Sequence, residues 1–494
     1  MTTLEIGNVE GLPAYEQAQL NELVEVFRYH QTKNAKKEKY YEGHISLHEV
    51  NLGVALPADS NLRNLEIGCE WGGKCVDVLA SRSMFDGYVG SNGEENAEAS
   101  RIASDNKLMT EYAKACRDEL KFGCTFATLS ADDTIGCRIR FHSPQTAAAL
   151  WDGSKGRIDC GIAIIDSQKD ESDNTWKPSI VNMYTEDAVY VLTKTGALWS
   201  AEAHPHTMGR PLMEPLVWNA TSAKPFGRSR IKEPVRHLIE GYVRTIANAT
   251  IGLEFSTSPQ KYLLGLTDEQ YDAIINQKFR QYVGSLIAAT SNPETGEKPT
   301  FGQLSQGNIE PHVQMIRILA TQFSAATGLS VTDTGVVNDA NPTSSEAIIA
   351  QTQTLIMMAE QLNRSNGDAL RTIMIMAQAI AENKTVAELT DEATGVIAHF
   401  KNPAMPSVAS TADAATKISA VRPEFASTDT FLEMIGFDQA DIRRIKAQEQ
   451  RARGQKILVE EFGNADINTG LAELHRENVE DKPDGSGANA GMDS

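Results

Sequence analysis

Residues 68–75, GCEWGGKC, come closest to a motif that performs chemistry. They match the phosphate-binding loop GxxxxGK[ST] except at the last position, where Cys75 replaces the hydroxyl residue that binds Mg²⁺. A thiol is a poor substitute for that oxygen ligand. The apolar run GIAIID ends at Asp166 and imitates the strand and acid that would hold the metal, but Ser167 stands where a base is expected. A nucleotide hydrolase is therefore the enzymatic alternative, although such near-matches are frequent by chance.

A structural interpretation of residues 68–75 is simpler. No clear apolar strand precedes Gly68, although a phosphate-binding loop would need one. We expect a loop followed by a helix over Trp71–Ser81, with Trp71 buried and Lys74 exposed.

Histidines offer a second candidate, a zinc site. His44 and His48 are four residues apart, a spacing that binds zinc when both lie on a helix, and His204 and His206 lie elsewhere. No further ligand set is evident, which favours structural or surface roles. Ser/His/Asp orders and paired carboxylates do not stand out among 66 acidic residues. The sequence therefore predicts no catalytic centre, no metal site and no cofactor.

Composition narrows the class of protein. The chain has 494 residues, 41% of them hydrophobic and 23% charged, which is ordinary for a globular protein. A net charge of −20 argues against a tight DNA clamp, which needs a strongly basic face, but allows a protein past which DNA slides. The six cysteines lie in the first third without a CxxC motif, which favours a reducing interior. The N-terminus lacks signal-peptide features, and the apolar run Ile373–Ala381 is too short to span a bilayer, so we expect a soluble protein.

The stretch from residue 309 to residue 362 organises the rest of the chain. Pro311 and Gly328 mark the ends of a helix predicted over residues 310–327. Its apolar face recurs at three- and four-residue steps and comprises Val313, Ile316, Ala320, Phe323 and Thr327. A polar loop over residues 330–343 follows, long enough to indicate a function or disorder. Ser344 or Ser345 then caps a second long helix.

Other elements follow from periodicity. Helices are predicted over Tyr15–Lys39, Glu95–Leu120, Arg230–Gly252 and Asp268–Ala288, and short strands between Phe122 and Asn219, with DSQKDESDNTWKP as an exposed acidic loop. Beyond residue 362 we expect an interruption at NRSNGDA, a helix over Leu370–Ile380 and a helical region over Val408–Glu461. The basic clusters near residues 33–39 and 441–456 are interpreted as solvated helix faces or ends, with DNA contact as the alternative.

Three motifs in order resemble the portal proteins of long-tailed, siphophage-type tailed bacteriophages. The first is TQFSAATGLS, a polar loop, and NPTSSEAI opening a long helix; the second is KPFGRSRIKEPVRHLIEGYVRTIANATIGLEFSTSPQKYLLGL. The third is KEKYYEGHISLHEVNLGVALP followed by WGGKCVDVLASRSMFDGY. The resemblance covers nearly the whole chain, and the order of the motifs carries it.

The resemblance implies an α+β portal fold that assembles as a ring. Its parts are a wing with a helical N-terminus and a β-rich portion (1–225), a first stem helix (226–256), a small α/β clip (257–308), a second stem helix (309–328), a tunnel loop (329–344), a long helix returning to the wing (345–400), a helical crown (401–463) and a disordered acidic tail (464–494).

The resemblance also implies a function and partners. The expected protein is a homo-oligomer, typically a dodecamer, at a unique capsid vertex of the virion, made in the host bacterial cytoplasm. Double-stranded DNA would pass through it without sequence specificity during packaging, retention and ejection. Its other partners would be the large terminase ATPase, the head–tail connector or adaptor, and the major capsid and scaffold proteins, with no membrane. The alternatives are a nucleotide-hydrolysing packaging motor and another structural capsid or connector protein.

Site residues can be assigned on the same resemblance. The tunnel loop facing DNA would carry Thr332, Asp333, Thr334, Val337, Asn338, Asp339 and Asn341. The stem interface between subunits would use Ile231, Val235, Leu238, Tyr242, Val313, Ile316 and Phe323. Docking of partners on the clip would use Tyr262, Leu263, Leu264, Lys278 and Arg280.

Overall fold

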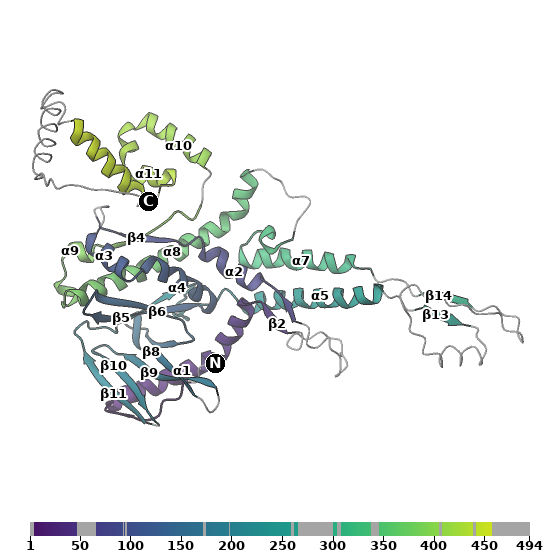
Figure 1. The fold of residues 1–494 in the computed structure, drawn as a ribbon, viewed down its shortest axis with the longest axis horizontal. Helices are drawn as coiled ribbons and strands as arrows, with labels where there is room; N and C mark the ends of the chain where they lie inside the picture. The colour runs from purple at the N-terminus through teal and green to yellow at the C-terminus, as the bar shows by residue number, and fades with distance from the viewer. Residues whose placement is uncertain are drawn as a thin grey trace, which may run out of the picture. The chain divides into compact units, whose positions relative to one another are not determined.

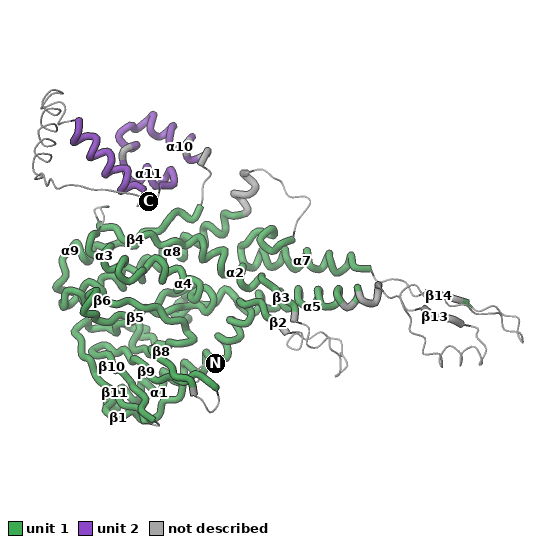
Figure 2. The backbone as a smooth tube through the Cα atoms, in the orientation of Figure 1, with its two compact units in different colours: residues 1–404 green, residues 405–494 purple. Residues whose placement is uncertain are grey.

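The computed structural model describes residues 4–46, 66–91, 93, 96–170, 174–196, 198–257, 261–264, 300–303, 308–336, 345–404, 408–437 and 441–456. The chain divides into two compact units, Met1–Ala404 and Met405–Ser494 (Figure 2). Helices and strands are mixed, which confirms the predicted α+β class. Within the described ranges, no helix has the length and apolarity needed to cross a membrane.

The first unit holds most of the regular structure. Its described helices are α1 (Ala14–Tyr41), α2 (Trp71–Ala80), α3 (Ala97–Asp105), α4 (Leu108–Phe122), α5 (Glu233–Thr257), α7 (Glu310–Thr327), α8 (Ser345–Ala381) and α9 (Asp391–Thr394), with the 3₁₀ turns η2 (Val331–Thr334) and η3 (Val386–Glu388). Its described strands are β1 (Val9–Glu10), β2 (His44–Ser46), β3 (Glu66–Gly68), β4 (Phe85–Val89), β5 (Cys124–Asp132), β6 (Gly136–His142), β7 (Ala147–Asp152), β8 (Arg157–Asp170), β9 (Thr175–Tyr184), β10 (Ala188–Thr195), β11 (Leu198–Pro205), β12 (Met213–Val217), β13 (Lys261–Leu264), β14 (Thr300–Gln303) and β15 (Ile397–Phe400).

A six-stranded sheet in the order β1-β11-β10-β9-β8-β7 forms one layer (Figure 1). Neighbouring strands are antiparallel except β1, which runs parallel to β11. Alternate residues of β10, namely Ala188, Tyr190 and Leu192, are buried, as expected when one face of a sheet is covered. The cover is α1, which packs on β7 and β8 and contributes Leu23 and Phe27 to the shared core. The strand-rich region predicted between residues 122 and 219 is confirmed.

The hairpin formed by β8 and β9 is longer than the sequence predicted. The prediction of an exposed loop over residues 166–178 is wrong at both ends, because β8 continues to Asp170 and β9 begins at Thr175. Lys169 pairs with Trp176, and the register shifts around Asp166. Backbone hydrogen bonding therefore extends the ladder through a polar sequence that has no apolar face to signal a strand.

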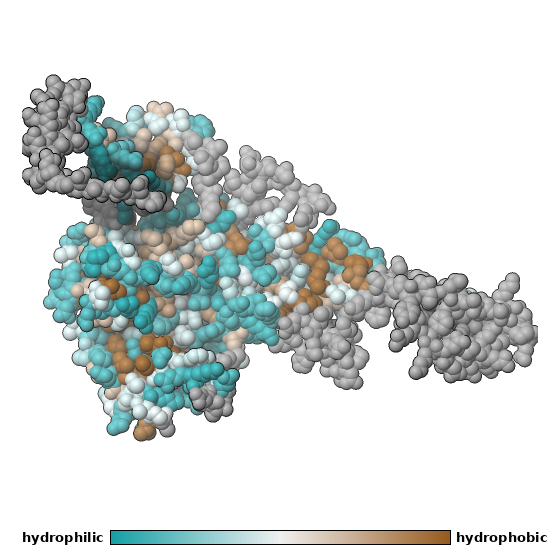
Figure 3. Space-filling view, viewed as in Figure 1, coloured by the Kyte–Doolittle hydropathy of each residue, from teal (hydrophilic) through white to brown (hydrophobic). Residues whose placement is uncertain are grey.

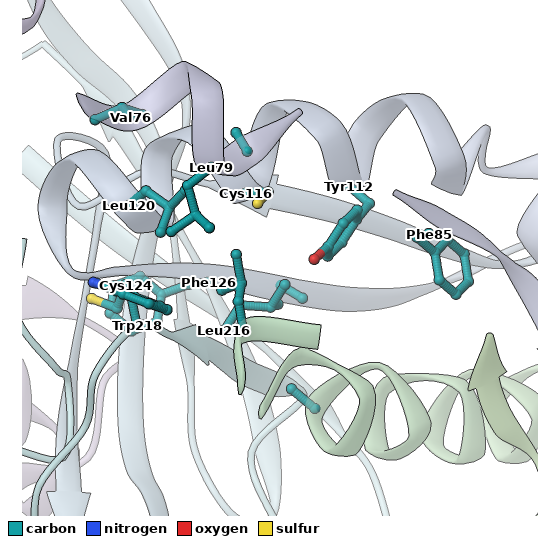
Figure 4. Close-up of a cluster of buried hydrophobic side chains, with 14 of the residues drawn as sticks. Val76, Leu79, Phe85, Tyr112, Cys116, Leu120, Cys124, Phe126, Leu216 and Trp218 are labelled. Atoms are coloured by element: carbon teal, nitrogen blue, oxygen red, sulfur yellow. The ribbon is translucent and has the colours of Figure 1, made fainter. Parts of the chain in front are cut away.

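A three-stranded sheet in the order β12-β5-β6 lies at the centre of the second layer. Both α4 and α8 pack against this sheet. Figure 4 shows Tyr112, Cys116 and Leu120 of α4 gathered with Phe126 and Leu216 of the sheet. Far along the chain, β15 pairs antiparallel with β4 in a separate two-stranded sheet, which contacts α8 and α4.

The helix predicted over Glu95–Leu120 is two helices, α3 and α4. They are separated at Asn106 and at Lys107, whose backbone is left-handed with φ 52°. The Asn106 amide explains the break, since its Nδ2 donates to the Cys137 carbonyl at 2.9 Å and its Oδ1 accepts from the Ile139 amide at 2.8 Å. Contact with β6 therefore ends α3, although the apolar periodicity runs on through the break.

The interruption predicted at residues 363–369 is also wrong, because α8 is continuous from Ser345 to Ala381. Asn366 is fully buried and its Nδ2 donates to Glu119 Oε2 at 2.7 Å and to the Tyr112 hydroxyl at 3.0 Å. One turn earlier, Asn363 Oδ1 accepts from Ser83 Oγ at 2.6 Å. The polar residues that suggested a loop are thus the side of α8 that faces polar groups of α4 and of the residues before β4. Burial raises the pKa of the Glu119 carboxyl to about 8.

The second unit consists of α10 (Val408–Val421), η4 (Pro423–Ser427), α11 (Asp429–Ile435) and a helix over residues 441–456. Phe431 and Ile442 are buried, and the rings of Phe425 and Phe431 lie 5.7 Å apart. Lys446 pairs with Asp429 at 2.6 Å, whereas Arg451 and Arg453 are exposed. The prediction of a helical region beginning at residue 408 is confirmed, with breaks at residues 422–428 and at Gly436.

Candidate functional site

Helices α5 and α7 lie side by side and form the candidate site (Figure 1). Four buried apolar residues of α5 recur every four positions, at Val235, Ile239, Val243 and Ala247, and so form one line along the helix. On α7 the buried residues are Leu319, Ala320, Phe323 and Thr327. A Cβ on Gly241 would lie 3.2 Å from Leu319, so the missing side chain lets the helices approach closely. One chain therefore closes this seam by itself.

The first of these helices begins later than the sequence predicted. The helix expected over Arg230–Gly252 is observed over Glu233–Thr257. Arg230 and Ile231 precede it, because the Arg230 backbone amide donates to the Leu120 carbonyl at 2.9 Å and its side chain is buried. The helix predicted over residues 310–327 is confirmed, with Gly328 as its left-handed C-cap.

Trp71 joins this helix pair to the rest of the first unit. Its ring centroid lies 4.6 Å from that of Tyr242 on α5 and 4.9 Å from that of Phe323 on α7. Its indole Nε1 donates to the Thr334 carbonyl at 3.1 Å. A single side chain on α2 therefore contacts both helices and the turn that follows them, and such aromatic contacts stabilise beyond the buried area alone.

Arg230 makes a second connection among the same elements. Its guanidinium is buried and donates to the Cys75 carbonyl at 2.6 Å and to the Thr327 carbonyl at 2.7 Å. Its Nη1 lies 3.5 Å from Met358 Sδ on α8. Because Thr327 ends α7, the cation sits at the negative end of that helix dipole. The C-terminus of α7 is therefore held to α2 and α8.

The first residues of the predicted tunnel loop form the turn η2, beside the contacts of Trp71 and Arg230. Ser330 and Asp333 form a capping box for η2, in which Asp333 Oδ2 accepts from the Ser330 amide at 3.0 Å and from Ser330 Oγ at 2.8 Å. Thr332 is exposed, and Thr334 is half-buried. The carboxylate of Asp333 is thus engaged in its own turn. Val337, Asn338, Asp339 and Asn341 lie outside the described residues.

The predicted interface residues occupy three different environments. Ile231, Val235 and Phe323 are buried within one chain; Leu238, Tyr242 and Ile316 are half-buried; and Val313 is exposed. The first group closes the seam inside the chain, so of these side chains Val313 is the most accessible to a neighbour. The predicted contact with a neighbouring chain stays a prediction.

An apolar stripe that the sequence analysis missed lies on the outside of this helix pair. Met315 is 44% exposed and Ile318 52% exposed on α7, with Val313 at 37% and Leu253 of α5 at 44%. Figure 3 shows hydrophobic side chains gathered over α5 and α7. The available signal was the three-residue spacing of Met315 and Ile318, which places them on a different side of α7 from Phe323. We call Met315 and Ile318 the outer stripe, because Val313, seven residues before Ala320, lies on the other side of α7.

The phosphate-loop near-match has a packing explanation. A Cβ on Gly72 would lie 1.9 Å from the Tyr40 carbonyl oxygen at the end of α1, so only glycine fits there. Trp71 is buried and Lys74 is exposed, as predicted, and buried Cys75 donates through Sγ to the Arg230 carbonyl at 3.7 Å. Gly68 is the last residue of the three-residue strand β3, which pairs with the equally short β2, and residues 47–65 lie outside the described residues.

The remaining predicted residues are spread over the chain. His44 is exposed on β2, His204 is exposed on β11, and His206 is half-buried, with a pKa lowered by burial. Among the residues that the structure describes, no group of three metal-binding side chains occurs. Tyr262, Leu263 and Leu264 lie on β13, paired with β14. His48, Lys278, Arg280 and the helix predicted over residues 268–288 lie outside the described residues.

A family model and two relatives agree on one family. A family model described as "Phage portal protein, SPP1 Gp6-like" matches residues 20–455. The chain is similar to the portal protein of Mycobacterium phage D29, with 23% identity over 412 residues covering 81% of each chain. It is similar to the portal protein of Mycobacterium phage L5, with 23% identity over 380 residues covering 74% of this chain and 75% of the relative. Among solved structures, it is similar to a chain from the neck of an empty GTA particle, with a TM-score of 0.43, 11% identity and coverage of 71% of this chain and 86% of that chain.

Proposed function

The chain belongs to the phage portal protein family, and on that basis we propose that its copies close into a ring around a channel for double-stranded DNA. This membership makes it a structural component of the phage capsid rather than an enzyme, and it confirms the family that the sequence motifs indicated. The ring would be a dodecamer at a unique vertex of the virion.

The outer stripe is the observation that supports assembly into a ring. Met315 and Ile318, three residues apart on one side of α7, remain 44% and 52% exposed in the single chain. Fully burying a side chain of this size stabilises by about 1.5–3 kcal/mol, so partial exposure leaves a substantial share of that free energy to a neighbour. A head-to-tail contact between this stripe and a different surface of the next copy closes into a ring when the rotation closes.

The parts of the portal fold map onto the elements as follows. Residues 1–225 form the wing, α5 and α7 the stem, residues 257–308 the clip, residues 329–344 the tunnel loop, α8 and β15 the return to the wing, residues 401–463 the crown and residues 464–494 an acidic tail. Support comes from the closed seam between α5 and α7, which the clip segment connects.

The tunnel loop would face DNA beyond its ordered base. Asn338, Asp339 and Asn341 follow the η2 turn that Trp71 and the capping box hold in place. Amide and carboxylate side chains offer phosphates little attraction, and the net charge of −20 keeps DNA moving rather than captured.

The partners of the ring would meet it at separate surfaces. The large terminase ATPase and then the head–tail connector would dock on the clip through residues near Tyr262–Leu264, Lys278 and Arg280. The major capsid and scaffold proteins would contact the ring as it is built into the shell, after synthesis in the host cytoplasm.

Mass photometry and cryo-electron microscopy of the full chain test this proposal. We expect closed rings with an axial opening wide enough for B-DNA. The double variant Met315→Glu with Ile318→Glu should remain folded and monomeric, because it places charges in the contact but not in the seam. A matched control, Met109→Glu with Leu198→Glu, changes two exposed apolar residues elsewhere and should still form rings. Rings formed equally well by both variants would rule out the outer stripe as the interface, and a parent chain that never closes, even with scaffold protein, would rule out the ring.

A further inference from the structure

A cavity of about 480 Å³ opens between α1 and the turn over residues 224–229, in the first unit and outside the α5–α7 seam. Its floor is apolar and is lined by Phe27, Phe122, Phe126 and Phe226, with the small residues of β7 at positions 147–149 beside them. Phe226 packs edge-on against Phe126 and Trp151 at 5.7 Å. A cavity of this size and lining suits one or two large apolar side chains.

The rim of the same cavity is cationic. Lys33 and Lys37 reach it from α1, and Lys224 and Arg228 from the turn. No carboxylate is among the described residues that line it, and within the described part of the chain none of these four cations has a carboxylate partner. Such a cluster stands out in a chain with a net charge of −20. Like charges gathered without counter-charges favour an anionic ligand.

The rim is also rigid. Gly227 has φ 65°, and a Cβ there would lie 2.1 Å from the Trp218 carbonyl oxygen. The Arg228 amide donates to the same carbonyl at 3.0 Å. Lys37 Nζ is anchored by donating to the Phe122 carbonyl at 2.8 Å, and burial lowers the pKa of Lys37 to about 8. Because the backbone of the turn and the Lys37 ammonium are already in position, less ordering is needed when an anion binds.

We propose that this cavity docks an acidic peptide segment of a partner protein, with a large apolar side chain in the phenylalanine-lined floor and carboxylates on the lysines and Arg228. Charge complementarity with the rim argues for this occupant, and the concave apolar floor argues for a peptide. A DNA duplex presents its phosphates on a convex cylinder, and its apolar thymine methyl groups lie inside the major groove rather than projecting toward the floor.

Fluorescence anisotropy with the full chain tests the proposal. The probes are three fluorescein-labelled heptapeptides, Glu-Asp-Glu-X-Asp-Glu-Asp, in which X is Phe, Leu or Ser. We expect the Phe and Leu peptides to bind and the Ser peptide to bind about tenfold more weakly, because one side chain in an apolar pocket contributes about 1–3 kcal/mol. The variant Lys224→Glu with Arg228→Glu should weaken binding of the Phe peptide by about tenfold or more, since both side chains are exposed and reversal replaces attraction with repulsion.

The control variant Arg451→Glu with Arg453→Glu makes the same change in net charge at two exposed residues of the second unit, and it should bind the Phe peptide like the parent chain. Thermal denaturation confirms that each variant is folded. Equal binding of the Ser and Phe peptides would overturn the role of the floor. Absence of peptide binding at low salt would overturn the proposal, as would a short DNA duplex that binds more tightly than the peptides and loses affinity in the Lys224 and Arg228 variant.

Discussion

Trp71→Phe separates the ring packing of the Trp71 indole from its hydrogen bond to the turn η2. Phenylalanine keeps an aromatic ring between Tyr242 and Phe323 but removes the Nε1 donor to the Thr334 carbonyl. The seam between α5 and α7 should therefore stay closed. The turn η2, at the base of the tunnel loop, should lose its connection to α2.

The size of the effect follows from the bond that is lost. One hydrogen bond between neutral groups contributes about 0.5–1.5 kcal/mol net, so the turn should open about fivefold more often for a loss near 1 kcal/mol. The smaller ring also leaves unfilled volume at a side chain that is only 4% exposed. We expect the free energy of unfolding to fall by about 1–3 kcal/mol in total.

Hydrogen exchange on the full chain measures both the opening of η2 and the free energy of unfolding. The amides of Asp333 and Gly335, which donate to the Ser330 and Thr332 carbonyls, report opening of η2. Trp199→Phe is the control, because Trp199 is also 4% exposed but belongs to the core of the six-stranded sheet. Both variants should lower the melting temperature, and only Trp71→Phe should speed exchange selectively at these two amides. If exchange there is unchanged while the melting temperature falls, the indole does not hold the turn.

Two further predictions concern buried positions. The Glu119 carboxyl has a folded pKa near 8 and an ordinary value near 4.5, so the folded chain holds one more proton between these pH values. The parent should therefore lose stability relative to Glu119→Gln as pH rises from about 5 to 8, and a difference in melting temperature that does not change with pH would contradict this. Gly72→Ala should cost about 3 kcal/mol or more, because its Cβ meets the Tyr40 carbonyl oxygen. Gly68→Ala meets no atom within 4 Å and should leave the melting temperature nearly unchanged; equal effects of the two glycine substitutions would contradict the packing explanation.

Local sequence patterns were sufficient to predict an element where one of its faces is apolar and capping residues mark its ends. The helix over residues 310–327 follows from its apolar steps, Pro311 and Gly328, and the structure has the same bounds. The strand-rich region and the burial of Trp71 were likewise predictable. Each depends on residues close together in sequence, which is the information that periodicity carries.

Contacts between distant residues explain the failures. Asn366 looks like a loop residue until Tyr112 and Glu119 lie beside it, and Asn106 breaks a periodic helix only because β6 lies beside it. The predicted stem interface combines residues that one chain buries with residues that it leaves accessible, because periodicity does not say which side of α7 one chain covers itself. Phe323 is covered by Trp71, which precedes it by about 250 residues, and this left the side with Ile318 exposed.

The pairing of β4 with β15 has a consequence for the order of events during synthesis. Phe85 and Phe400 are register partners, so the two-stranded sheet that contains β4 cannot close until the ribosome has delivered residue 400. At about 5–20 residues per second, the nascent β4 waits roughly 15–60 s for its partner. A shortened chain that ends before β15 therefore lacks a finished core. The first unit therefore finishes folding only after translation is nearly complete. Only then can a copy present the outer stripe to a neighbouring copy from a folded domain.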